Sequence, residues 1–477
     1  MRHTKFALAA MTLAVLAGCG GTDPKPGDQT IKNKYSSQVS FGDDLADVGS
    51  YAVGPVAALK GGKFTINGDN TATVSTLTGK NWTELVAAQL GVAAPCAALT
   101  GLDGDASQGF SVPQVAHANC YGYAQGGSRV TNPVGPGNKL TGSPLGALTI
   151  PVTTQIDNHL KAVGGKFKGD EMVFIMAGGN DVLLNLSKLS ADATAAGAAA
   201  GAKAGAEAGA TAYVTSLVGQ LAAGATTPQA AAAAIGLAAQ TEAARSGSTQ
   251  TSITQVAIGT AAVQPGNSAV AAQTVWQPMV DKAKVDANTA GLAAGNAAGA
   301  KAGADYAAAH GPDLITAMAT AGAELVALVK TKIIANGANY VTVNNLPDVA
   351  TTPAGRSQPA SSQALINAMV SAFNGALTTG LASESKVLIV DVFAASHDQA
   401  TNPGPYGLTN VSETACDLSV AKNPLGSSLV CHGGADGNLK AGDISHWSFA
   451  DDVHPTPFNN LLLARYVAEK LVVKGWL

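Results

Sequence analysis

A short apolar run near residue 174 places the strongest constraint on the fold of this chain. The run Glu171-Met-Val-Phe-Ile-Met-Ala177 has almost no polar positions and is followed at once by two glycines. A run of this length without polar alternation indicates a strand that is buried on both faces, as in a parallel sheet. Further strands are predicted at Tyr35–Phe41, Tyr340–Val343 and Lys386–Asp391.

Helical patterns separate these strands. Apolar residues recur at helical spacing in 82–90, 153–163, 361–382 and 456–473. Strands that alternate with helices are typical of α/β folds, in which helices pack on the faces of a mostly parallel sheet. We therefore expect a three-layer α/β/α sandwich over residues 35–477, with its functional site at the carboxyl ends of the strands.

Residues 184–335 interrupt this alternation and form a predicted insertion rich in alanine and glycine. Glycine recurs at every fourth position from Gly197 to Gly209 and again from Gly291 to Gly303. On a helix this spacing places the glycines along one side, where a second helix backbone can approach closely. We expect two long helices packed on each other, with residues 240–275 connecting them.

Two other interpretations of the insertion remain open at this point. A low-complexity segment of this composition can also be disordered. A transmembrane hairpin is disfavoured, because the charged residues Lys203, Glu207, Lys301 and Asp305 interrupt both runs.

The amino terminus has the pattern of an export signal. Arg2, His3 and Lys5 precede a short apolar stretch, and Leu16-Ala-Gly-Cys19 then resembles a bacterial lipobox. The pattern predicts a lipoprotein signal peptide at 1–18, lipidation of Cys19 and a flexible tether at 19–34. Because glycine, not aspartate, follows Cys19, the resemblance implies an outer-membrane or cell-surface location. An ordinary secretory signal is the alternative.

The remaining cysteines agree with export. Four are left if Cys19 carries lipid, and an even number in an exported chain suggests two disulfides. Of the three possible pairings we prefer the local one, because each of its loops is short. The predicted pairs are Cys96–Cys120 and Cys416–Cys431. The spacing of these cysteines does not favour a metal site.

Charge and composition exclude some partners. The 477 residues carry a formal net charge of −4, and only 13% are Asp, Glu, Lys or Arg. No basic patch or arginine-rich run indicates binding to nucleic acid. No protein partner can be identified from the sequence.

Four separated segments carry the residues suited to chemistry. Each is predicted at a transition from strand to loop or near the carboxyl end of the chain. The segments are Phe41-Gly-Asp-Asp-Leu-Ala-Asp-Val-Gly49, Asn119–Val130, Gly178-Gly-Asn-Asp181 and Phe449–Thr456. Taken singly, the glycines fit tight turns and the asparagine fits a helix cap. A histidine, an acidic residue three positions before it, and backbone or amide donors are the parts that acyl transfer requires.

In this order the four segments resemble the sequence blocks of the SGNH (GDSL) ester hydrolases. The resemblance implies that Gly127, with Gly126 as the fallback, and Asn180 donate to an oxyanion. It further implies that His454 is the base and that Asp451 orients its imidazole. Members of this family hydrolyse carboxylic esters, as esterases or lipases, through an acyl-serine intermediate and without a metal or organic cofactor.

One position departs from the family pattern F-G-D-S-L-x-D-x-G. The nucleophilic serine of that pattern is replaced here by Asp44. A carboxylate has no proton to give to His454 near neutral pH and is a weak nucleophile toward an ester. We expect an ion pair between Asp44 and His454. Ser40 and Ser50 are the nearest serines, and neither fits the nucleophile position without a change of register.

The sequence therefore predicts an exported, lipid-anchored ester hydrolase whose substrate is a small-molecule or lipid ester, with turnover limited by Asp44. The alternative is a non-catalytic surface lipoprotein that binds esters, acylated glycans or lipids in the retained cleft. A third possibility is an adhesive or structural lipoprotein that works through the insertion at 184–335.

Overall fold

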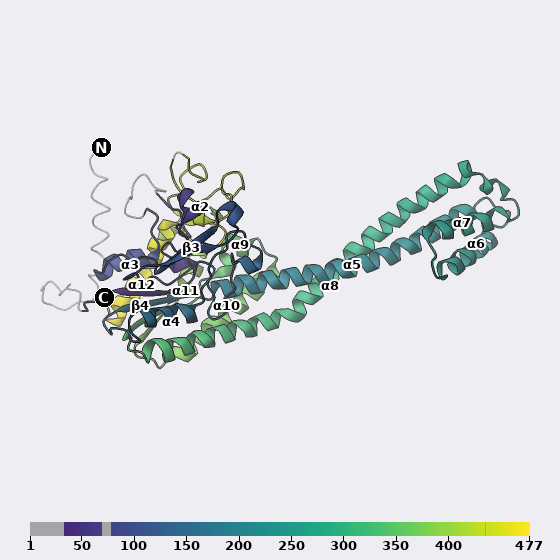
Figure 1. Cartoon of the computed structure of the whole chain (residues 1–477). Helices are drawn as coiled ribbons and strands as arrows, with labels where there is room; N and C mark the ends of the chain where they lie inside the picture. Colours follow the sequence, from purple (N-terminus) through teal and green to yellow (C-terminus); the bar gives the residue numbers. More distant parts are fainter. Residues whose placement is uncertain (1–32, 69–77, 435) are drawn as a thin grey trace.

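The computed structural model describes residues 33–68, 78–434 and 436–477 (Figure 1). The expected signal peptide, Cys19 and nearly all of the tether lie outside the described residues. The protein is a mixed α/β molecule with one principal sheet and a long helical projection.

Over the described ranges, the principal sheet has four parallel strands in the order β1-β4-β5-β6. Each predicted strand is present within a few residues of its expected bounds. The strands are β1 (Gln38–Gly42), β4 (Met172–Met176), β5 (Tyr340–Asn344) and β6 (Val387–Val390). In register, Gly42 is paired with Met176, and Met176 with Asn344. The carboxyl ends of these three strands therefore meet at one edge of the sheet.

Alternate strand residues enter two different apolar clusters. Val39 and Val173 pack with residues of α4 (Val152–Ala162), α10 (Ala360–Leu381) and the end of α8 (Gln273–Leu328). The residues of β4 that point the other way pack with α3 (Trp82–Leu90) and α12 (Pro457–Lys474). This alternation of side chains along a strand, with period two, explains why the strands read as continuously apolar.

The smaller elements surround this core. Two minor sheets are formed, one antiparallel and one parallel. Their strands are β2 (Leu99–Asp103) with β3 (Ser111–Ala116), and β7 (Asn410–Thr414) with β8 (Trp447–Phe449). The short helices are η2 (Asp44–Ala46), α2 (Gly54–Ala58), η4 (Ala106–Gln108), η5 (Lys139–Thr141), η8 (Val349–Thr351), α9 (Pro353–Arg356), α11 (Val392–Thr401), η9 (Gly404–Tyr406) and η10 (Ser428–Val430).

Both predicted disulfides are present. Cys96 is bonded to Cys120, and Cys416 is bonded to Cys431. Cys416 and Cys431 are fully buried in a small apolar cluster that is separate from the main core. The local pairing is therefore confirmed, and disulfides of this kind are compatible with an exported protein.

The two glycine runs lie on two long helices that project from the α/β body (Figure 1). They are α5 (Gly179–Ala222) and α8, which is followed by a π-helical turn, η7 (Val329–Ile334). A Cβ atom built on Gly201 would lie 2.8 Å from the carbonyl oxygen of Gly295, and one built on Gly205 would lie 2.9 Å from that of Gly291. The glycines therefore permit backbone contact between the helices, as their spacing predicts.

The connection between the two long helices differs from the expectation. It extends from the end of α5 to the start of α8 and contains α6 (Pro228–Ala243), α7 (Gln250–Ala262) and η6 (Ser268–Ala271). Apolar residues from these helices form a separate small core with the far ends of α5 and α8. Alanine-rich segments become helical here because they can bury one face against neighbouring helices.

The base of the predicted insertion belongs to the main core. Met318, Leu325 and Ile333 are fully buried against the sheet and α10. By length and apolar composition, the helical segments Gln273–Ile334 and Ala360–Leu381 are candidates to cross a membrane, although only 33% of the most apolar window of each is buried in the structure. Core helices of soluble proteins meet the same criterion, and α10 lies in the core.

Replacing Gly201 by leucine is expected to open the helical pair locally. A leucine side chain would be forced against the backbone of the partner helix, at a cost of about 1–3 kcal/mol. Hydrogen exchange of the amides in 193–209 and 287–303 should accelerate accordingly. Ala199→Leu is the matched control, because Ala199 is exposed on the same helix. The glycine seam is the line of contact between Gly197–Gly209 and Gly291–Gly303. Equal exchange rates in the two variants would contradict the conclusion that this seam holds the helices together.

Candidate functional site

The candidate nucleophile position lies in a tight loop at the carboxyl end of β1. Gly42 ends this strand with a φ of 144°, and a Cβ atom there would lie only 1.9 Å from the carbonyl oxygen of Met176. Asp43 then accepts a hydrogen bond from the backbone N–H of Leu45 and begins the short helix η2. Asp44 is the first residue of that helix, and its side chain is only 12% exposed.

Two donors from distant segments converge on the Asp44 carboxylate. The backbone N–H of Gly127 lies 3.1 Å from both carboxylate oxygens, and Nδ2 of Asn180 lies 2.5 Å from Oδ2. Asn180 is in the first turn of α5, directly after β4. The structure thus brings the two predicted oxyanion donors together, and both are already engaged by a side chain of the protein.

Gly127, not Gly126, provides the donor in the second segment. The N–H of Gly126 instead donates to Oδ2 of Asp47 at 2.9 Å. Gly127 has a φ of +76°, and a Cβ atom there would lie 2.2 Å from the carbonyl oxygen of Pro136. Gly126, the fallback position, therefore joins two loops and does not donate to residue 44.

His454 lies between two carboxylates. Its Nδ1 is 2.8 Å from both oxygens of Asp451, and its Nε2 is 3.5 Å from Oδ1 of Asp44. The side chain of Asp451 also accepts hydrogen bonds from the N–H groups of Ser428 and His454, at 2.6 and 2.8 Å. The Asp451–His454 contact and the Asp44–His454 ion pair both agree with the sequence expectation.

These contacts change the ionisation of the site. Burial alone would lower the pKa of His454, but the charge of Asp451 and the hydrogen bonds to both carboxylates raise it to about 10. Burial opposes ionisation of Asp44, yet the hydrogen bond and charge of His454, with the donors Asn180 and Gly127, hold its pKa below the usual range. Burial and the charge of Asp44 raise the pKa of Asp43. Near neutral pH these shifts favour an ionised Asp44 and a protonated His454, with Asp451 on the other side of the imidazole.

Several supporting residues were not singled out from the sequence. Asp47 accepts hydrogen bonds from the N–H groups of Gly49 and Ser50, each at 2.8 Å, in addition to that of Gly126. It thereby ties the Asp44 loop to the Gly127 loop. Burial raises the pKa of Asp47 to about 6. The only available signal was its place in the first motif.

Gln155 and Asp181 fix the same loops from the other side. The amide of Gln155 contacts both the N–H and the carbonyl of Gly42, each at 2.8 Å, and also the hydroxyl of Ser128. Asp181 forms an ion pair with Nε of Arg129 at 2.8 Å. Gln155 comes from a helix that carries no motif, so only the folded structure reveals this contact.

Neither nearby serine replaces Asp44. Ser40 is buried inside β1, and the hydroxyl of Ser50 donates to the carbonyl oxygen of Ala124 at 3.3 Å. Within the described ranges, no group of three or more His, Cys, Asp or Glu side chains has an arrangement that could hold a metal ion.

No protein-family model matches this chain, and no curated protein matches it.

Proposed function

We propose that this chain carries the site of an SGNH-type carboxylic ester hydrolase in which Asp44 occupies the nucleophile position. The supporting observation is that Gly127, Asn180 and the Asp451–His454 pair all converge on the side chain of residue 44. A three-layer α/β/α arrangement, with helices packed on both faces of the parallel sheet, belongs to the same proposal.

With serine at position 44, the residues of the site would carry out acyl transfer in the following steps. The hydroxyl oxygen attacks the ester carbonyl while Nε2 of His454 takes its proton, and Asp451 stabilises the imidazolium. Gly127 and Asn180 donate to the oxyanion of the tetrahedral intermediate. The intermediate collapses as His454 returns the proton to the leaving alcohol, and a water molecule then hydrolyses the acyl-serine.

Aspartate at position 44 prevents these steps of acyl transfer. Its carboxylate has no proton to transfer, its acyl product would be an anhydride, and its oxygens take the donors that the oxyanion needs. We therefore expect the chain as it stands to hydrolyse esters no faster than an Asp44→Ala variant.

Active-site labelling tests the proposal directly. A fluorophosphonate should attach covalently to residue 44 of an Asp44→Ser variant, as peptide mass spectrometry would show. The double variant Asp44→Ser with His454→Ala should label far more slowly. An unlabelled, well-folded Asp44→Ser protein would count against acyl transfer at this site.

A second candidate function is a non-catalytic surface lipoprotein that binds esters, acylated glycans or lipids. The observation that favours it is the same occupation of both donors by Asp44. If Asp44→Ser is neither labelled nor active, this function takes first place.

Lipid anchoring at Cys19 is tested by cell fractionation. The leader pattern predicts that the mature chain remains in the membrane pellet without detergent, because its lipidated cysteine inserts into the bilayer. Cys19→Ala should release the chain into the soluble fraction or leave an uncleaved precursor. Unchanged fractionation and unchanged mass in this variant would overturn the assignment.

A further inference from the structure

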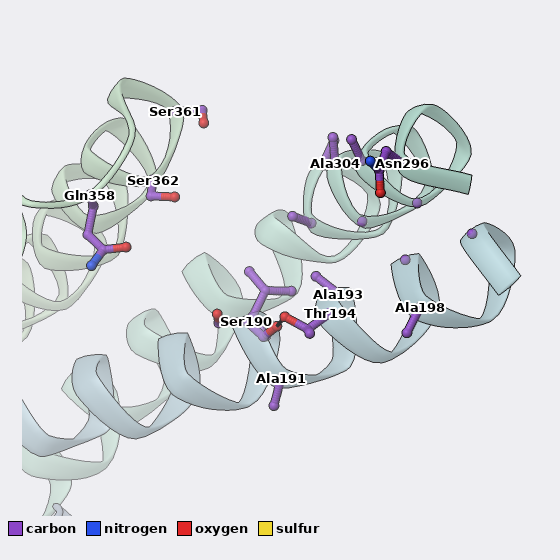
Figure 2. A pocket seen from close by; sticks show the side chains of 18 of the residues that line it. Ser190, Ala191, Ala193, Thr194, Ala198, Asn296, Ala304, Gln358, Ser361 and Ser362 are labelled. Atoms are coloured by element: carbon purple, nitrogen blue, oxygen red, sulfur yellow. Dashed lines mark hydrogen bonds between the residues drawn. The ribbon is translucent and has the colours of Figure 1, made fainter. Parts of the chain in front are cut away.

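A groove of about 1920 Å³ lies where the α5–α8 hairpin leaves the α/β body (Figure 2). Its walls come from α5, α8, α9 and the amino-terminal end of α10. Figure 2 shows Ser190 and Thr194 on α5 across from Gln358 and Ser362.

The lining of the groove is uncharged and mostly aliphatic. None of the described residues that line it carries a charge, and most are alanine, glycine or larger aliphatic residues. Most of the larger aliphatic side chains are at its base, next to the α/β body. They are Leu183, Leu186, Leu189, Ile315, Val349, Leu365 and Ile366, whereas Leu292 lies farther out on α8. Binding of a hydrocarbon chain to such a surface is favourable, because it removes apolar area from water. The surface provides no partner for an ionic group.

Two elements connect the base of the groove to segments of the candidate site. Leu183 follows the oxyanion donor Asn180 by three residues on α5, which is a rise of about 4.5 Å along the helix and the same face. On the opposite wall, the N–H of Ala354 donates to the carbonyl oxygen of Asp452 at 3.0 Å. Asp452 lies in the loop between Asp451 and His454.

We propose that this groove binds the hydrocarbon chain of a long-chain acyl ester, whose carbonyl group would reach Asn180 only when serine replaces Asp44 and frees that donor. The proposal rests on the proposed function and specifies its substrate class. The glycine seam holds α5 and α8 close together, so that their alanine side chains form the shallow outer part of the groove.

Ligand binding to the chain with Asp44 in place tests the groove without requiring catalysis. The probe is N-methyl dodecanamide, a neutral and non-hydrolysable mimic of a long-chain ester, with N-methyl acetamide as the short-chain comparison. Calorimetry should detect saturable binding of the long amide alone. Ser362→Trp, which fills the groove, should weaken it at least about tenfold, the loss expected when two methylene groups are displaced.

The matched control is Ala364→Trp, because Ala364 is exposed on the same helix and does not line the groove. It should bind the long amide as the parent does. Ser190→Trp provides a second obstruction from the opposite wall if Ser362→Trp does not fold. Absent binding, or equal binding in obstructed and control variants, would overturn the groove assignment.

Hydrolysis separates this proposal from the one on which it rests. In the Asp44→Ser background, Ser362→Trp should lower kcat/KM for a p-nitrophenyl palmitate at least about tenfold and leave that for the butyrate unchanged. If Asp44→Ser hydrolyses both esters and Ser362→Trp changes neither, the hydrolase function stands and the groove fails. If Asp44→Ser is inactive but Ser362→Trp abolishes amide binding, the groove stands as a lipid-binding site.

Discussion

The Asp44→Ser variant is expected to hydrolyse short-chain esters roughly 10⁴- to 10⁶-fold faster than the chain with aspartate, the range lost when one member of a catalytic triad is removed. Serine both provides a nucleophile whose proton His454 can accept and leaves Gly127 and Asn180 free to stabilise the oxyanion. The measurement is kcat/KM for p-nitrophenyl butyrate at neutral pH.

Two control variants define the contribution of each group. Asp44→Ala removes the carboxylate without adding a nucleophile, so it should stay as slow as the parent chain. Asp44→Ser with His454→Ala should lose most of the gained activity, because no base remains to activate the hydroxyl. Activity of the parent chain equal to that of Asp44→Ser would show that Asp44 is not the block described here.

A second large effect is expected in the pH dependence of stability. The pKa of His454 is raised from 6.5 to about 10 in the folded chain. Between these two values the folded state binds more protons than the unfolded state, so the free energy of unfolding falls as pH rises. The loss across this window is up to about 5 kcal/mol, and all of the stabilisation is present below pH 6.5. Guanidine unfolding at pH 6 and pH 10 measures it.

The variant His454→Gln tests the origin of this slope. It keeps a polar side chain but cannot titrate, so the fall in stability between pH 6.5 and 10 should largely disappear. Asp44→Ser should lower the pKa of His454 in the folded chain, because one of the two carboxylates that stabilise the imidazolium is gone. The pH range over which stability falls should therefore end at a lower pH. A parent chain whose stability is flat from pH 6 to 10 would contradict the Asp44–His454–Asp451 triad.

Features governed by local chemistry could be predicted from the sequence. The run from Glu171 to Ala177 is a strand because it is apolar at every position and ends at glycines, and the structure has β4 at Met172–Met176. The four-residue glycine spacing predicts a close helical pair, because the helical repeat alone decides which residues share a face. The local disulfides could be predicted because both cysteines of each pair lie close in sequence.

The candidate site was predictable only as a set of residues. The motifs identify Gly127, Asn180, Asp451 and His454, but these lie on four segments whose separation depends on how the sheet and its loops pack. The sequence therefore predicts that His454 contacts Asp44 and that aspartate at position 44 puts negative charge where the oxyanion must sit, but only the structure shows which carboxylate oxygens accept from Gly127 and Asn180. That arrangement depends on the rotamer of one side chain in a buried loop.

Other features were decided by tertiary packing alone. The segment expected to be a simple connection is helical because residues from α6 and α7 find an apolar partner surface on α5 and α8. Gln155, on a helix without a motif, hydrogen-bonds the backbone of Gly42, because the packing of α4 on the sheet brings the two residues together. Local sequence thus determined the strands of the principal sheet, the two long helices and the reactive side chains of this protein. Packing of the sheet and hairpin determined what those side chains contact, because contacts between distant segments depend on the whole core and not on any one stretch of sequence.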